Sequence, residues 1–367
     1  MYKIIFLIST VYSLPQYKFD EEIEIHTKNF IEKNNLENYN YDNISIPMIF
    51  HVIYNFDNEY FIDLNIFKIT KIKIQEKIVD QLNKDYNLQN EDRFNTPKVW
   101  QHLMADFKIN FFIKTIKYIN GYSECDCDDE KYFQCVYKCS EKLKFSKNRG
   151  SDVIDPELNL NIWIINIRQK SNHRYLAGYA TFPNDYKNNP KIDGYVLNAL
   201  TFLNNNDRTS THEIGHWMNL RHIWGDGGCD DDDFVDDTPL SSKNHIECGS
   251  SIICEYPKTS SCGSPDMFMN YMSYGKEQYM FTKGQMLRAR SIFEKGGIRY
   301  SIVTQNKDDA PKKDDAPKKN DYLYYFIGIT IITFILLFLI LSILKLCTNN
   351  QLNSQLNHQE LINDIEE

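Results

Sequence analysis

The distribution of apolar residues along the chain predicts one globular body built from strands and helices. Four stretches have the apolar, β-branched composition of strands, and they comprise residues 46–54, 106–116, 158–167 and 195–202. Within residues 71–86 an apolar side chain recurs every four positions, at Ile74, Ile78, Leu82 and Tyr86. That spacing predicts an amphipathic helix. A second helix over residues 282–293, basic and apolar, closes the globular part.

Segments outside this body lack such patterns. Residues 14–45 are polar and irregular, which indicates an N-terminal extension or a propeptide before a body of residues 46–300. Residues 120–150 form a charged insertion that carries cysteines. Residues 301–321 contain the tandem repeat KDDAPK and too few apolar side chains to pack a core, so they predict a charged stalk. Residues 347–367 form a polar tail.

Two apolar segments frame the chain. Residues 1–13 combine Lys3 with a short apolar run and small residues near Ser13, as in a secretory signal peptide, although a first buried strand is the alternative. Residues 323–344 contain no charged side chain. They exceed the ~20 residues that a helix needs to cross a bilayer. We therefore expect one transmembrane helix within residues 322–346 and a single-pass membrane protein.

The orientation in the membrane follows from two opposing signals. Four lysines precede the apolar span and only Lys345 follows it closely, which alone would place the body in the cytoplasm. A cleaved signal peptide and cysteine pairs indicate the opposite side. We follow the second signal, because a signal peptide commits the N-terminal side to translocation first. The globular body is therefore expected to be extracellular or lumenal.

Charge and cysteine content narrow the function classes. The net charge is −9 and no basic stripe interleaved with aromatics occurs, so nucleic acid is not an expected partner. Eight of the nine cysteines form two clusters of four, which favours disulfides over free thiols. For the first cluster a zinc site of four thiolates is the alternative. The clusters are Cys125, Cys127, Cys135 and Cys139, then Cys229, Cys248, Cys254 and Cys262, with Cys347 apart.

One motif carries metal chemistry. Residues 212–216 read His-Glu-Ile-Gly-His, and on a helix His212 and His216 share a face and can bind one metal. Glu213 lies beside a ligand, where it can contact the metal's water. His222 can return to the metal only if the helix stops near Asn219, and Asn is the non-glycine residue that best tolerates a positive φ. Ordinary surface or core histidines are the alternative.

This constellation resembles the long zinc motif of the metzincins, H-E-x-x-H-x-x-G-x-x-H, with Asn219 in the glycine position. Three stretches are similar to the pappalysin and cytophagalysin branch in particular. They are HEIGHWMNLRHIWGDGGCDDDDFVDDTP, CGSPDMFMNYMSY and MFTKGQMLRAR. The resemblance extends over residues 46–295 and implies an α/β (α+β) fold: a twisted, mostly parallel sheet, an active-site helix, a Met-turn and a C-terminal helix.

The resemblance also implies a role for each matching residue. His212, His216 and His222 would ligate zinc, and Glu213 would be the general base. A peptide substrate would then lie antiparallel to an edge strand near residues 195–200. A latency device based on a propeptide cysteine would be absent, because the first cysteine is Cys125.

Further residues match less specific parts of the pattern. Met272 would be the methionine of the Met-turn, and Tyr274 would stabilise the oxyanion; core packing is the alternative for both. The acidic loop resembles a calcium-binding stretch of the family, and a solvated acidic surface is the alternative there. Its expected ligands are Asp236, Asp237 and Thr238.

The second cysteine cluster departs from the family pattern. The resemblance pairs Cys229 with Cys262. The family partner of Cys248, just after the Met-turn, is missing here, and the additional Cys254 predicts a substitute Cys248–Cys254 bond.

We therefore expect a zinc-dependent endopeptidase that cleaves protein or peptide substrates at a membrane surface. Two alternatives stay open at this point. One is a catalytically inactive surface adhesin on the same fold, and the other is a metal hydrolase that acts on non-peptide substrates.

Overall fold

A computed structural model describes residues 17–34, 41–54, 69–121, 132–165, 176–203 and 207–305 of the chain. The expected signal peptide, the transmembrane segment 322–346, the polar tail and most of the stalk lie outside these ranges. None of the helices within the described ranges combines the length and apolar character that a membrane crossing requires.

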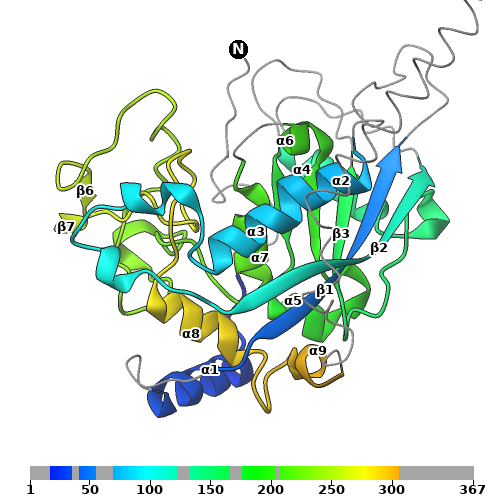
Figure 1. Cartoon of the computed structure of the whole chain (residues 1–367), viewed down its shortest axis with the longest axis horizontal. Helices are drawn as coiled ribbons and strands as arrows, with labels where there is room; N and C mark the ends of the chain where they lie inside the picture. The colour runs from blue at the N-terminus through cyan, green and yellow to red at the C-terminus, as the bar shows by residue number, and fades with distance from the viewer. Residues whose placement is uncertain are drawn as a thin grey trace, which may run out of the picture. The chain divides into compact units, whose positions relative to one another are not determined.

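A sheet of five strands organises the body (Figure 1). Its order is β2-β1-β3-β5-β4, and all neighbouring pairs are parallel except β4 with β5. The strands are β1 (Ile44–Tyr54), β2 (Ile109–Asn120), β3 (Leu160–Ile165), β4 (Gly178–Ala180) and β5 (Tyr195–Asn198). β1 and β3 are buried along nearly their whole length, as expected for inner strands covered on both faces. The mostly parallel sheet predicted from the sequence is confirmed.

Helices cover the sheet and position the segments around the site. The predicted helix over residues 71–86 is continuous and runs through α2 (Lys71–Ile74), a π-helical turn η3 (Gln75–Val79) and α3 (Asp80–Tyr86). α7 (Thr209–Trp217) packs against β4, β5 and α3. Figure 1 shows α1 (Glu21–Lys33) beside α8 (Lys283–Ser291) at one end of the body, and these two helices are in contact.

Shorter elements complete the described ranges. The remaining α-helices are α4 (Tyr132–Lys142), α5 (Pro183–Asn188), α6 (Ala199–Leu203) and α9 (Tyr300–Gln305). The 3-10 turns are η4 (Glu91–Asn95), η5 (Gln101–Leu103), η7 (Ser146–Asn148), η8 (Pro190–Ile192) and η9 (Gly228–Asp230). A small hairpin pairs β6 (Ser260–Ser261) with β7 (Ser264–Pro265).

The structure corrects two sequence predictions near the site. The strand expected over residues 195–202 ends at Asn198, whose side-chain oxygen accepts the backbone N–H of Leu200 and begins α6. β5 is also an internal strand, so residues 195–200 are not the edge. The edge strand on this side is the antiparallel β4.

The ends of the body are more ordered than their composition suggested. Within residues 14–45, expected to be irregular, Asp20 caps the helix α1 by accepting the backbone N–H of Ile23. At the other end, α9 continues into the expected stalk and buries Ile302. Packing therefore extends beyond residues 46–300 on both sides.

Disulfides stabilise the irregular region between α7 and α8. The bonds Cys229–Cys262 and Cys248–Cys254 are both present, with Cα–Cα separations of 5.4 and 5.3 Å. Cys135 and Cys139 of α4 are also disulfide-bonded. A zinc site of four thiolates in the first cluster is therefore not what the structure contains; the remaining cysteines lie outside the described residues.

Candidate metal centre

Helix α7 carries the first half of the motif. His212, Glu213 and His216 all lie on it, and each side chain is at least nine-tenths buried. The helix stops immediately afterwards, because Asn219 adopts a left-handed conformation with φ 73°. The backbone N–H of Leu220 then turns back to the carbonyl of Gly215 at 2.9 Å, which closes the helix end.

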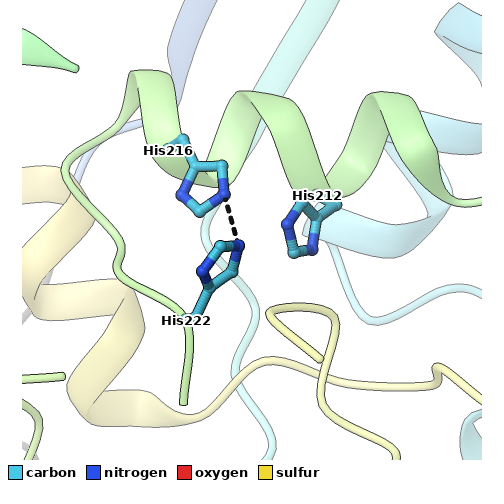
Figure 2. Close-up of side chains that lie close together, drawn as sticks. All are labelled: His212, His216 and His222. Atoms are coloured by element: carbon cyan, nitrogen blue, oxygen red, sulfur yellow. Dashed lines mark hydrogen bonds between the residues drawn. The ribbon is translucent and has the colours of Figure 1, made fainter. Parts of the chain in front are cut away.

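This turn brings the third histidine back to the first two. The ring of His222 lies 4.6 Å from that of His216 and 5.2 Å from that of His212, measured between centroids. Figure 2 shows the three rings converging from the helix and from the segment that follows it. Within the described residues, these three histidines form the group whose ligand atoms lie close enough together, within 4.8 Å, to hold one metal ion.

Hydrogen bonds fix the tautomer of each ring. The Nδ1 atoms lie against oxygen acceptors, at 2.7, 2.8 and 2.6 Å respectively, so each Nδ1 donates a proton. The three pairs are His212 with the carbonyl of Tyr271, His216 with the carbonyl of Leu220, and His222 with the carboxylate of Asp226. In the neutral form of each ring, the Nε2 atom is therefore left with a lone pair.

The resulting geometry fits a cation. The Nε2 atoms of His216 and His222 are 3.1 Å apart, the contact dashed in Figure 2, and when both rings are neutral with Nδ1 protonated, neither Nε2 carries a proton. Two lone pairs facing each other at this distance repel unless a positive ion lies between them. Burial also lowers the pKa of His212 to about 3 and that of His216 well below its usual value. Neutral imidazoles are the form that binds metal.

Glu213 lies beside the three histidines and contacts the edge strand β4. Its carboxylate accepts a hydrogen bond from the backbone of Ala180 in β4, and its side chain packs beside Gly178. Burial raises the pKa of Glu213 to about 8, although the Ala180 hydrogen bond opposes the rise and the charge of Asp207 adds to it. A buried carboxyl group whose pKa lies near neutral pH is suited to taking up and releasing a proton.

Met272 and Tyr274 lie on the turn that faces the helix. Met272 is fully buried, and its sulfur lies against Gly215 of α7. The ring of Tyr274 lies 5.4 Å from that of His212 and 4.9 Å from that of His222. Burial raises the pKa of Tyr274 well above its usual value, so its hydroxyl keeps its proton.

Three residues near the ligands were not predicted from the sequence. Trp224 stacks on His222 at 4.1 Å, and Phe182 packs on His216 at 4.9 Å, so both shield the site from water. Asp226 holds the Nδ1 of His222. In the sequence, Asp226 stands out only by its position four residues after His222. That spacing brings two side chains together on a helix, but the helix has already ended before His222.

The expected calcium ligands of the acidic loop take part in contacts within the fold. Asp237 accepts hydrogen bonds from the Thr282 hydroxyl and the Gly284 backbone, at the start of α8. Thr238 donates to the buried carboxylate of Asp233, and Asp236 is exposed. Asp237 and Thr238 thus form hydrogen bonds within the local fold, and calcium binding by this loop stays a prediction.

The site consists of a helix with two histidines, followed by a left-handed turn and a third histidine, with a methionine beneath the helix. This arrangement defines the metzincin class of metalloprotease. Comparison with known proteins agrees. The sequence profile of peptidase family M43, described as pregnancy-associated plasma protein-A, matches residues 145–294. Over these residues the chain is similar to the pappalysin family of metalloproteases.

Individual relatives show how far the similarity extends. An extracellular metalloprotease of Arthroderma benhamiae is 34% identical over 152 residues, which is 37% of this chain and 48% of the relative. One from Arthroderma otae is 39% identical over 132 residues, or 32% and 46% of the two chains. The chain thus spans about half the length of these relatives. Mature mirolysin of Tannerella forsythia, solved with a cleaved peptide, has a TM-score of 0.61 at 29% identity over 74% of this chain and 100% of that one.

The contact between Gly215 and Met272 can be tested directly. A Cβ at residue 215 would collide with the Met272 sulfur and lie 3.2 Å from its Cε. Replacing glycine by alanine inside a helix normally stabilises by roughly 0.5–1 kcal/mol. Here we expect Gly215→Ala to lower the free energy of unfolding by about 1–3 kcal/mol, measured in urea, because Met272 must shift within a packed core. Adding Met272→Val should recover part of the loss, whereas a single variant as stable as the parent chain would contradict the contact.

Proposed function

We propose that the chain is a zinc-dependent endopeptidase. The observation that carries this proposal is the convergence of His212, His216 and His222, each with its Nδ1 against an oxygen acceptor, beside the buried carboxylate of Glu213. Three neutral imidazoles with one open position are the ligand set of catalytic zinc. Bound zinc would polarise a peptide carbonyl and lower the pKa of a water molecule from 15.7 to about 7.

The chain's own residues would then move the protons. Glu213 takes a proton from the attacking water and passes it to the leaving amine. The hydrogen bond from the Ala180 backbone orients the carboxylate, and burial keeps competing water away from it. Tyr274, protonated and packed against two ligand rings, donates its hydroxyl hydrogen to the oxyanion that forms on the peptide carbonyl.

The substrate would be an extended peptide. β4 forms the edge of the sheet and holds Glu213 through Ala180, so a peptide strand that pairs with β4 would place its carbonyl beside the carboxylate. The solved mirolysin structure with a cleaved peptide supports this class of substrate. Protein or peptide chains are therefore the proposed partners.

Where the enzyme acts is also part of the proposal. The fungal relatives are named extracellular metalloproteases, which agrees with a signal peptide at residues 1–13 and with disulfides in the body. Anchoring by residues 322–346 stays a prediction from the sequence, as does action at a membrane surface.

Glu213→Gln separates binding from chemistry. The amide keeps the shape of the side chain and can still accept from Ala180, but it cannot take up a proton. We expect about 10²–10⁴-fold lower kcat toward an unfolded protein substrate, with one zinc per chain retained by elemental analysis. Glu76→Gln, on the exposed face of η3, should leave both values unchanged.

Two further outcomes decide the function class. The parent chain should lose its activity in a chelator and regain it when zinc is added. A metal-loaded parent chain that cleaves no protein would favour the inactive adhesin, and full activity of Glu213→Gln would remove Glu213 from the mechanism.

Tyr274→Phe tests the oxyanion role. Removing only the hydroxyl keeps the ring contacts with His212 and His222 and should lower kcat by roughly 10²-fold, as for the loss of one oxyanion donor. KM should change little, because the hydrogen bond forms in the transition state. Steady-state kinetics measure both values. An unchanged kcat would leave Tyr274 as a packing residue.

Calcium binding by the acidic loop stays a prediction. The resemblance that suggested it names Asp236, Asp237 and Thr238, two of which are already engaged within the fold. If the loop binds calcium, millimolar Ca²⁺ should raise the unfolding temperature, and Asp236→Asn should reduce that rise. No rise with Ca²⁺ would leave the loop a solvated acidic surface.

A further inference from the structure

The position of His222 depends on one peptide plane, between Asn219 and Leu220. On one side of this plane the Leu220 N–H bonds the Gly215 carbonyl at 2.9 Å. On the other side the Asn219 carbonyl accepts the Nε–H of Arg288 at 2.8 Å. The next carbonyl along the chain, that of Leu220, holds the Nδ1 of His216. Rotation of the plane would therefore disturb two ligands at once.

Arg288 is held in place by a residue from the opposite end of the chain. Its side chain is almost completely buried on α8, at 1% exposed, so its charge requires a partner. Glu24 of α1 supplies it, with two hydrogen bonds of 2.6 and 2.8 Å to the guanidinium fork. Although burial opposes it, the hydrogen bonds and charge of Arg288 keep the pKa of Glu24 below its usual value, so the carboxylate stays ionised.

Glu24 also contacts the turn itself. The side-chain amide of Asn219 donates to the Glu24 carboxylate at 3.4 Å, and the Tyr17 hydroxyl donates to the same group. Glycine, the residue of the family motif at position 219, could make no such bond. The left-handed turn in this chain is thus tied to α1 directly and through Arg288.

Two further contacts of α1 anchor it to the helix that carries Arg288. The His26 ring lies 2.9 Å from the carbonyl of Ser291, and the hydroxyls of Thr27 and Ser291 are 3.0 Å apart, the latter pair buried. α1 therefore packs as a fixed part of the body. A second buried arginine, Arg299, donates to the carbonyl of Trp217 at the end of α7. Its counter-ion, Asp193, does not come from α1.

We propose that Glu24 and Arg288 are positioning residues of the metal centre, and that the N-terminal helix α1 belongs to the catalytic unit. The inference rests on the proposed zinc site. It decides between the two roles that the sequence left for residues 14–45: α1 is retained in the active enzyme and is not a removable propeptide.

The experiment measures how fast the full chain releases zinc to a chelator. Glu24→Gln removes the charge that fixes Arg288, and we expect about tenfold faster release, within the range found when a partner of a metal ligand is lost. The Co²⁺-substituted variant should also show a shifted visible spectrum, which reports ligand geometry rather than fold stability. Glu22→Gln is the matched control, because Glu22 lies on the same helix α1 as Glu24 and forms an exposed ion pair with Lys187 of α5.

A double-variant cycle separates positioning from general stability. In an Asn219→Gly background the turn needs no outside support, so Glu24→Gln should change zinc release by less than about twofold. Arg288→Lys keeps the charge but loses the Nε–H bond to Asn219, and should behave like Glu24→Gln. If Glu24→Gln does not fold, Arg288→Lys with and without Asn219→Gly carries the same test.

Three results would overturn the inference. The first is that Glu24→Gln releases zinc as slowly as the parent chain, and the second is that the effects of Glu24→Gln and Asn219→Gly on zinc release simply add. The third is that a chain cleaved after α1 loses the helix and keeps its zinc. These are distinct from failure of the proposed function, which would appear as a parent chain that binds no zinc or cleaves no peptide.

Discussion

The site depends on holding three imidazole rings close together in a buried space. Because the lone pairs of His216 and His222 repel at 3.1 Å, the chain must hold them there before any cation can offset the repulsion. It does so through one oxygen acceptor per ring, and these acceptors come from separate segments. Leu220 lies on the left-handed turn, Asp226 on the loop after it, and Tyr271 on the Met-turn. The metal centre is therefore only as well defined as the packing between these segments.

A buried carboxylate behind the site joins the Met-turn to helix α7. Asp85 of α3 accepts from the Thr211 hydroxyl on α7 and from the Tyr271 hydroxyl on the Met-turn, and it pairs with Arg208. Burial raises the pKa of Asp85 to about 6, while Arg208 and the hydrogen bonds oppose that rise. The carbonyl of Tyr271 holds His212, so Asp85 fixes the same residue at its other end. One cluster of polar side chains thus fixes the positions of both α7 and the Met-turn beneath it.

The sequence predicted the parts of this site that depend on local spacing. The spacing of His212, His216 and His222 and the tolerance of Asn219 for positive φ follow from single-chain geometry, as do the inner strands. Strand order does not, because no local pattern separates an edge strand from an internal one. The helix α1 was missed for a related reason. Its segment is polar, and the bond that makes it part of the site joins Glu24 to a residue 264 positions away.

Asn219 shows why the N-terminal helix and the departure from the family motif belong together. A left-handed conformation is strained for any residue with a Cβ, and asparagine reduces that strain without removing it. The same side chain offers an amide that glycine lacks, and here that amide reaches Glu24. The substitution that makes the turn harder to form therefore also supplies the bond that supports it. Without α1, a chain with asparagine at this position would keep the strain and lose both the amide bond and the counter-ion of Arg288.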